Sequence, residues 1–482
     1  MIDLRPVFYV NGILLATLAV VMVIPAAVDA GYGDDNWRAF LAASGLTLFV
    51  GVALIFTMRS QDISINIRQA FVLTSSSWLV LTMFAALPFA FSGLQMSYTD
   101  SFFEAMSGFT TTGATVLTGL GGLPEGVLIW RALLQWLGGI GIIVMAVAIL
   151  PLLHVGGMQL FRTESSDASE KVLPRATQLA GAIGSIYFVC TAAAAICYWG
   201  AGMTGFEAIA HSMTTISTGG FSTVDGSIGA FGSPGIEWFG IIFMIVGALP
   251  FVLYLQVVRG QPAALWRDSQ VRWFLVAIVL MVALVWLLHM RGGDTSPGTS
   301  LRLSAFNVVS IVTGTGYSSA DYYSWGPYAV TIFFLAMFLG GCAGSTTCGI
   351  KIFRFQVLYK TGTVHLRRLF RPHGVFLAYY NDQPITDEVA TSVMSFFFFY
   401  VLVFVCLTAA LGIVGLDFLT AVSGAASAIS NVGPGLGEII GPAGTYTDLP
   451  DLAKWILAAG MLIGRLELFT ILVLFAPSFW RQ

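Results

Sequence analysis

The sequence predicts an all-α, polytopic membrane protein. Its 482 residues are 57% hydrophobic and only 10% charged, which is less than half the charged share of a typical soluble domain. Apolar runs of about 20 residues, enough for a helix to cross the hydrocarbon core of a bilayer, recur along the whole chain. The net charge of −3 argues against a nucleic-acid partner, because binding to phosphates requires a clustered basic face.

Ten apolar runs can be counted, and we expect each to form one transmembrane helix. The first run follows Arg5 and is too long for the apolar core of a cleavable signal peptide. The predicted spans cover residues 8–29, 39–58, 70–93, 128–151, 176–200, 236–258, 271–290, 327–350, 390–413 and 453–477.

The basic residues indicate the orientation, because Lys and Arg concentrate on the cytoplasmic side of membrane proteins. With the N-terminus inside, 16 of the 22 basic residues fall in cytoplasmic segments and five fall outside. We therefore expect both termini in the cytoplasm. The inside set includes Arg162, Lys171, Lys351 and Arg354, and the outside set includes Arg131.

Four of the predicted outer connections contain a short, semi-apolar segment with a Gly- and Thr/Ser-rich centre. Aligned on one glycine, these segments are residues 106–116, 212–222, 307–317 and 426–436. Each lies between two apolar spans, so the last eight spans form four units of helix, pore loop and helix. An extra N-terminal helix pair covers residues 1–65, and the units cover 66–160, 170–260, 268–372 (with a broken second helix) and 385–482.

The repeated segments predict a pore with fourfold pseudo-symmetry. Backbone that is not helical is tolerated at membrane depth only where protein buries it or where it lines water. Four short helices ending in turns around one axis would bring their last carbonyls to that axis, where a ring of oxygens can replace the water shell of a cation. Glycine suits such turns because it accepts positive φ. The alternative is that these small residues only allow close helix packing, which explains one copy better than four.

The four segments resemble the filter segments of the bacterial Trk/Ktr/HKT superfamily of potassium transporters, and most closely those of the TrkH/TrkG membrane subunit. The resemblance extends over essentially the whole chain, including the N-terminal helix pair. It rests on TTTGAT at 110–115, TGGFS at 218–222, TGTGY at 313–317 and NVGPG at 431–435.

The resemblance implies a potassium pore in the bacterial inner membrane, with K⁺ as the transported ion and no organic cofactor bound by this chain. It also implies a homodimer in the lipid bilayer and a cytoplasmic ring of nucleotide-binding, TrkA-type regulatory subunits. Relatives that prefer sodium have serine at the first filter glycine, so Gly113 favours potassium. Carried over by position, the implied ion-coordinating residues are Thr111, Thr112, Gly113, Ser217, Thr218, Gly219, Val312, Thr313, Gly314, Asn431, Val432 and Gly433.

The predicted span 327–350 ends in the run GGCAGSTTCGIK at residues 340–351. So many small and polar residues should break the helix, since each interior glycine costs about 1 kcal/mol relative to alanine. The resemblance implies an intramembrane gating loop here, whereas the alternative is a small-residue face that packs on another helix. The residues assigned to gating in this run are Gly340, Gly341, Gly344, Ser345 and Gly349.

Arg465 is the single basic residue deep inside a predicted span. An ionisable group at this depth usually faces a bundle interior or water. It is either a structural counter-charge or a positive charge that projects into the pore below the filter, and the resemblance favours the second, so Arg465 is also assigned to gating. Glu467, two positions further on, would lie on a different face of the same helix.

Other functional classes remain as alternatives. An intramembrane enzyme is not expected, because the five histidines show no metal-ligand spacing such as H-E-x-x-H. Within transport, the alternatives are a gated channel, a K⁺ symporter coupled to H⁺ or Na⁺, and a less selective K⁺/Na⁺ transporter. A lone Glu467 in the spans offers no obvious proton relay, which favours channel-like permeation.

Overall fold

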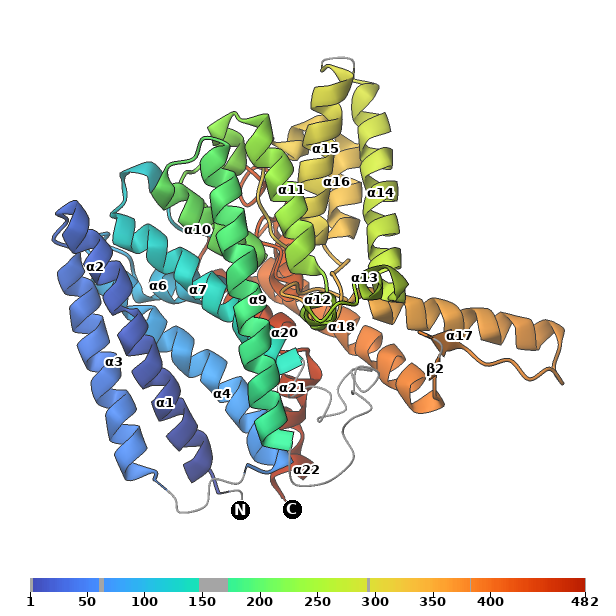
Figure 1. Cartoon of the computed structure of the whole chain (residues 1–482), viewed down its shortest axis with the longest axis horizontal. Coiled ribbons are helices and arrows are strands. Elements are labelled where there is room, and N and C mark those ends of the chain that lie inside the picture. The colour runs from blue at the N-terminus through green and yellow to red at the C-terminus, as the bar shows by residue number, and fades with distance from the viewer. Residues whose placement is uncertain (1–2, 60–64, 147–171, 293–294, 382, 482) are drawn as a thin grey trace.

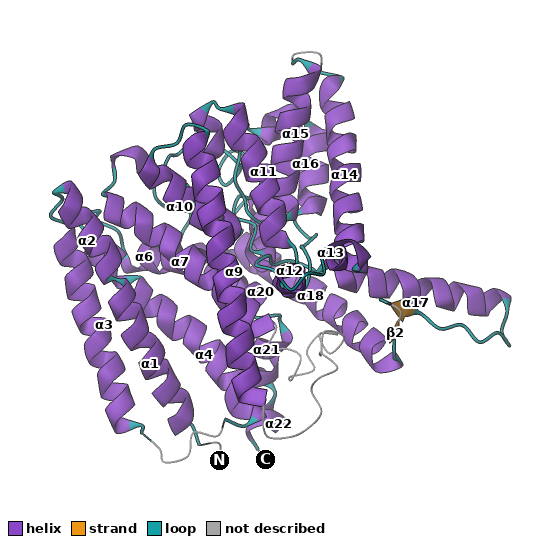
Figure 2. Cartoon of the chain, viewed as in Figure 1, coloured by secondary structure: helices purple, strands orange, loops and turns teal. Residues whose placement is uncertain are grey.

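The computed structural model describes residues 3–59, 65–146, 172–292, 295–381 and 383–481 (Figure 1). These residues are mostly helical, and within them one short hairpin pairs β1 (Tyr379–Tyr380) with β2 (Gln383–Pro384) (Figure 2). The predicted end of the fourth span at 151, the predicted end of the first unit at 160, and the predicted cytoplasmic residues Arg162 and Lys171 lie outside the described residues.

The N-terminal part is a pair of apolar helices. α1 (Arg5–Val21) and α2 (Val23–Tyr32) form one apolar stretch, and α3 (Trp37–Thr57) lies beside them (Figure 1). A Cβ built on Gly12 would lie 2.8 Å from the Gly51 carbonyl oxygen. The two backbones therefore approach as closely as small residues allow in membrane helices.

The remaining helices follow in four groups. The first group contains α4 (Ile67–Ala85), α5 (Leu87–Phe91), α6 (Tyr98–Phe109) and α7 (Glu125–Val144). The second contains α9 (Val172–Gly200), α10 (Gly205–Ile216), α11 (Pro234–Ala248), α12 (Phe251–Val258) and α13 (Ala263–Arg267). The third contains α14 (Ser269–Met290), α15 (Pro297–Val312), α16 (Pro327–Ala336) and α17 (Ile352–Phe370). The fourth contains α18 (Asp387–Val414), α19 (Phe418–Ser430), α20 (Asp451–Arg465), α21 (Phe469–Leu472) and α22 (Pro477–Trp480).

Three of the ten predicted spans are broken rather than continuous. Among the described residues, seven helices are long and apolar enough to cross a membrane, and two bent pairs raise that number to nine at most. α11 and α12 meet at 94°, with Pro250 at the break, and α20 and α21 meet at 106°. The eighth predicted span keeps only α16, and residues 337–351 continue as an irregular segment, which we call the intramembrane loop.

Four short helices, α6, α10, α15 and α19, lie before the four predicted pore segments. Each begins at a residue whose side chain accepts a hydrogen bond from the first helical turn, so each has a defined N-terminus. These N-cap residues are Ser97, Thr204, Ser296 and Asp417. The C-terminal halves of all four helices are buried, so each helix runs from an accessible start to an end inside the molecule.

The two termini lie at the same end of the molecule (Figure 1). The side-chain amide of Gln69 donates to the Asp3 carbonyl at 2.7 Å, and the ring centroids of Phe71 and Phe479 lie 6.3 Å apart. Asp3 and Phe479 therefore both lie against the start of α4. The two ends of the described chain therefore lie close to each other.

Candidate functional site

The four short helices end in turns with the same backbone conformation. Each turn contains a left-handed residue within two positions of the helix end: Thr111, Thr218, Gly314 and Asn431 have φ of 53°, 51°, 67° and 53°. The next amide donates to the carbonyl five positions back, as in a Schellman motif; the donors are Thr112, Gly219, Thr315 and Val432, at 2.8, 2.8, 2.8 and 3.0 Å. A second left-handed residue follows, and it is a glycine in every turn: Gly113, Gly220, Gly316 and Gly433.

This geometry corrects the register predicted for the second and third segments. The equivalent glycines are Gly220 and Gly316, one and two positions beyond the predicted Gly219 and Gly314. The third segment was misaligned because it has glycine at both left-handed positions, and the second because Gly219 directly precedes the left-handed Gly220. The equivalent residues are Thr111, Thr112 and Gly113 in the first turn, Thr218, Gly219 and Gly220 in the second, Gly314, Thr315 and Gly316 in the third, and Asn431, Val432 and Gly433 in the fourth.

The corrected register moves three predicted residues out of the turn positions. Ser217 and Thr313 are the C-caps of α10 and α15, and so correspond to Thr110, the C-cap of α6. Val312 is the last residue of α15. All three side chains are buried next to the turns.

The four turns touch one another in a closed cycle. A Cβ built on Gly113 would lie within 3.0 Å of the Gly219 carbonyl oxygen, nearer than real Cβ atoms approach. The same holds for Gly220 with Thr315, Gly316 with Val432 and Gly433 with Thr112. One contact, from an equivalent glycine to an equivalent carbonyl, is thus repeated four times and returns to its start. We call the carbonyl oxygens of Thr112, Gly219, Thr315 and Val432 the carbonyl ring.

Polar side chains that the sequence did not single out hold the first two turns from behind. Arg131 and Glu104 form an ion pair at 2.8 Å, and both are almost completely buried. Arg131 also donates to the Ser222 carbonyl at 2.8 Å, while the side-chain amide of Gln135 donates to the Gly219 carbonyl at 2.6 Å. Arg131 was predicted among the outer basic residues, but it is buried within α7. Its burial is possible because the buried Glu104 carboxylate compensates its charge.

The intramembrane loop is folded back and hydrogen-bonded to the bend between α11 and α12. At the base of the loop, the Gly340 amide donates a hydrogen bond to the Ile350 carbonyl at 2.9 Å. The amide of Thr346 donates to the Gly247 carbonyl at 3.2 Å, and the Thr218 hydroxyl donates to the Thr346 hydroxyl at 3.1 Å. The loop therefore lies directly against the second turn.

The residues predicted for gating in this loop lie together. Gly344 and Gly349 have left-handed φ of 75° and 70°, and the Ser345 hydroxyl closes a turn on the Cys342 carbonyl at 2.6 Å. A Cβ on Gly340 would overlap the Cys348 carbonyl, and one on Gly341 would overlap the Thr347 side chain. The small residues thus permit a compact, buried loop rather than a helix face, so the alternative of a small-residue helix face is wrong.

Arg465 fixes this loop to two other parts of the chain. Its guanidinium donates to the Thr346 carbonyl at 3.0 Å, to the Cys348 sulfur at 2.8 Å and to the Gly138 carbonyl at 2.8 Å. It is 1% exposed. Arg465 thus links the end of α20 to the loop and to α7.

The structure corrects two predictions about the residues near Arg465. α20 ends at Arg465, and Glu467 is left-handed with φ of 58°, so the two do not lie on one continuous helix. Glu467 forms a buried ion pair with Arg354, a partner that the sequence did not indicate. Lys351 and Arg354 are buried rather than exposed on the cytoplasmic face; Lys351 donates to the Thr347 carbonyl.

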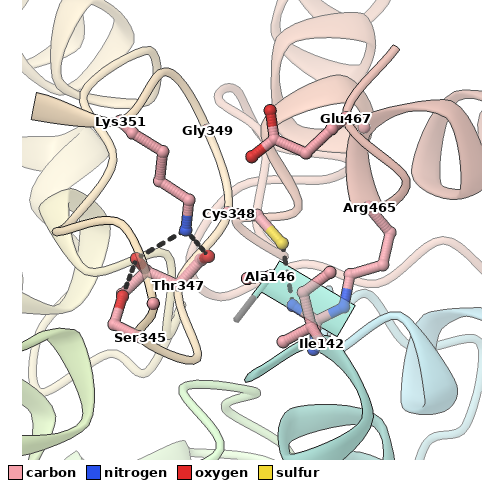
Figure 3. A pocket seen from close by; sticks show the side chains of 11 residues that line it. Ile142, Ala146, Ser345, Thr347, Cys348, Gly349, Lys351, Arg465 and Glu467 are labelled. Atoms are coloured by element: carbon pink, nitrogen blue, oxygen red, sulfur yellow. Dashed lines mark hydrogen bonds between the residues drawn. The ribbon is translucent and has the colours of Figure 1, made fainter. Parts of the chain in front are cut away.

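A small cavity lies between the loop and the end of α20 (Figure 3). Lys351 lines one side, Arg465 the other, and Thr347 and Cys348 lie between them. Its free volume is about 10 Å³, close to the space that a single water requires. The cavity is therefore too small for a hydrated ion, and its lining includes two basic side chains, Lys351 and Arg465, and one acidic side chain, Glu467.

This fold and this site define a polytopic membrane transport protein. The family model for TrkH, described as a cation transport protein, matches residues 37–482. The chain belongs to the TrkH family.

Relatives and a solved structure match the chain over nearly its whole length. It is 47% identical over 479 residues to the Trk system potassium uptake protein TrkI of Halomonas elongata, covering 99% of this chain and 97% of that protein. It is 38% identical over 483 residues to the Trk system potassium uptake protein TrkH of Escherichia coli K12, covering 99% of each. The crystal structure of the potassium transporter TrkH from Vibrio parahaemolyticus superposes with a TM-score of 0.93 at 37% identity, covering 100% of both chains.

Proposed function

We propose that this chain takes up potassium across the bacterial cytoplasmic membrane, as the names of its relatives state for those proteins. The observation that carries the proposal is the closed cycle of four equivalent contacts between glycine and carbonyl. A ring of backbone carbonyls can replace the water shell of a dehydrated cation. Backbone oxygen is the ligand available there, since the four turns contain no acidic side chain.

In this proposal the selectivity filter comprises the three equivalent residues of each turn in the corrected register. The carbonyl ring forms one level of it, and the carbonyls of Thr111, Thr218, Gly314 and Asn431 form the next. The substrate is K⁺, because Gly113 keeps the first turn free of a side chain where sodium-preferring relatives have serine.

We propose that the intramembrane loop and Arg465 form the gate. The cavity beside them admits about one water, so the loop must move before an ion passes. A guanidinium at this depth raises the barrier to a cation, because like charges repel strongly in a medium of low dielectric constant. We expect a cytoplasmic, nucleotide-binding subunit of the TrkA type to move the loop through α17, which begins directly after it.

The proposed architecture has ten crossings and fourfold pseudo-symmetry around one pore, with both termini in the cytoplasm and two chains forming a homodimer. The number is ten if each bent pair, and α16 with the intramembrane loop, counts as one crossing. The pseudo-symmetry is supported by the four matching helix ends and turns.

A channel-like mechanism is favoured over a symporter by the partners of three buried glutamates. Glu104 is paired with Arg131, Glu237 with Arg302 and Glu467 with Arg354. The fourth buried acid of the described residues, Asp29, belongs to the N-terminal helix pair and accepts hydrogen bonds from the Gly126 amide and the Asn36 side chain.

Growth of a potassium-uptake-deficient bacterium at low K⁺ tests the proposal. The wild-type chain should restore growth, whereas Gly220→Ala should not, because the new Cβ would collide with the Thr315 carbonyl. Gly121→Ala is the matched control, since nothing lies within 4 Å of its Cβ position. Growth with Gly220→Ala equal to the control, at equal membrane levels, would contradict the proposed filter.

A further inference from the structure

We infer that Gln135 is a positioning residue that sets potassium-over-sodium discrimination by holding the Gly219 carbonyl of the carbonyl ring. This inference rests on the proposed function. It adds a residue on α7, outside the four filter turns and outside the gate, to the determinants of selectivity.

Gln135 forms two hydrogen bonds with the backbone of the second turn. Its amide nitrogen donates to the Gly219 carbonyl at 2.6 Å, and its amide oxygen accepts from the Phe221 amide at 3.0 Å. The side chain is fully buried, and a Cβ on Gly219 would overlap it. The side-chain amide is therefore in close contact with the backbone of the turn. Its two hydrogen bonds restrain Gly219 from moving independently of Phe221.

This support distinguishes one position of the carbonyl ring from the other three. Within the described residues, Gly219 has the only ring carbonyl to which a side chain donates a hydrogen bond; Thr112, Thr315 and Val432 have no such donor. The Gly219 oxygen is also the one that faces Gly113 of the first turn. Gln135 thus fixes the junction between the first and second turns.

The face of α7 that carries Gln135 is itself held at both ends. One helical turn earlier, Arg131 donates to the Ser222 carbonyl and pairs with Glu104, which also accepts from the Val116 amide at 3.0 Å. Less than one turn later, the Gly138 carbonyl accepts from Arg465 at 2.8 Å. Gln135 is therefore a rigid support, anchored to the exit of both turns and to the gate.

The physical consequence concerns the smaller ion. Sodium requires its oxygens to move inward, whereas potassium is satisfied by a wider ring. A carbonyl tied to a buried amide resists that movement, and an amide–carbonyl hydrogen bond contributes a net of about 0.5–1.5 kcal/mol. If all of this acts against sodium, losing the bond should lower discrimination by roughly 2- to 10-fold.

The test compares Gln135→Met and Gln135→Leu with wild type in proteoliposomes, with ⁸⁶Rb⁺ uptake measured alone and in competition with Na⁺. Methionine keeps the approximate length but loses both hydrogen bonds. Leucine is shorter and also loses both hydrogen bonds, without adding a charge or a proton donor. Both variants should show a roughly 2- to 10-fold lower preference for Rb⁺ over Na⁺. Gln356→Met is the control, because Gln356 is an equally buried glutamine that donates to the Ser269 carbonyl at 2.9 Å, away from the turns.

The outcomes separate this inference from the proposed function. Absence of Rb⁺ uptake from both the wild-type protein and the Arg465→Ala variant, whose gate is expected to be open, would overturn the proposed function. Wild-type protein that prefers Rb⁺, with the same preference in the Gln135 variants that accumulate, would overturn the inference alone. A merely structural role predicts equal losses of Rb⁺ and Na⁺ flux with an unchanged ratio. If Gln135→Met fails to accumulate, Gln135→Leu decides.

Discussion

Thr111, Thr218 and Asn431 occupy a left-handed position where the third turn has Gly314. A side chain is therefore tolerated at this position, and a Cβ on Gly314 would lie 3.4 Å from its nearest neighbour, the Asn431 carbonyl. The second left-handed position is different, because its Cβ would collide with the backbone of the next turn. At the second position, glycine is favoured both by the φ values of 77° to 106° and by this close contact.

Gly314→Thr should consequently retain uptake, whereas Gly316→Ala should lose it. The new threonine reproduces the residue found at positions 111 and 218, while the alanine Cβ at 316 would overlap the Val432 carbonyl. Rubidium uptake into cells, normalised to the amount of protein in the membrane, measures both. Loss of uptake in Gly314→Thr equal to that in Gly316→Ala would contradict the tolerance of position 314 and with it the corrected register.

Gly113→Ser should raise sodium permeation relative to potassium. Its Cβ would push against the Gly219 carbonyl, the same oxygen that Gln135 holds, and so would displace the junction of the first two turns. The measurement is the ratio of tracer Na⁺ to Rb⁺ flux. An unchanged ratio would contradict the assignment of the first segment to the selectivity filter.

Among the secondary-structure elements, the proposed gate is formed where helices are interrupted: after α16, between α11 and α12, and between α20 and α21. The sequence indicated the loop after α16 from its glycines and hydroxyl residues, but the bends of α11–α12 and α20–α21 left weak signals. Pro250 marks one of them. The other depends on Glu467 and Leu468, which have φ of 58° and 41°; tertiary contacts, such as the pairing of Glu467 with Arg354, hold a conformation that these residue types do not prefer.

Arg465→Ala should increase the rate of potassium flux. The change removes a positive charge and the three hydrogen bonds that fix the intramembrane loop to α7 and α20. Flux through proteoliposomes measures the rate, and Arg302→Ala serves as a control, because that arginine is partly exposed and pairs with Glu237 away from the loop. A rate at or below wild type from folded protein would make Arg465 structural only.

Arg131→Met should destabilise the protein strongly, since it leaves Glu104 buried without its partner. Breaking a buried pair in this way typically costs about 3–5 kcal/mol. Lys454→Met is the comparison: Lys454 is also buried, but its partner Asp100 is 25% exposed and can be solvated. Thermal unfolding in detergent should therefore show a larger fall in Tm for Arg131→Met. A larger fall for Lys454→Met would contradict the role given to the Arg131–Glu104 pair.

For the whole molecule, the sequence predicted the membrane class, seven of the spans and the location of all four turns. These follow from long apolar runs and from a pattern repeated four times. The sequence could not predict the partners of the buried charges. The distribution of Lys and Arg assigns a basic residue to one side of the membrane, but it does not identify the carboxylate, such as Glu104 or Glu467, that pairs with a buried arginine. The sequence also missed Gln135, whose role depends on a contact between α7 and a turn 84 residues away.

The account depends most directly on uptake by the purified chain. In proteoliposomes, ⁸⁶Rb⁺ uptake should be inhibited by K⁺ much more strongly than by Na⁺, and should follow the Rb⁺ gradient whether or not proton and sodium gradients are imposed. Uptake that requires either of those gradients would contradict a channel-like mechanism. Equal inhibition by Na⁺ and K⁺ would contradict a potassium-selective filter built from the four glycine turns.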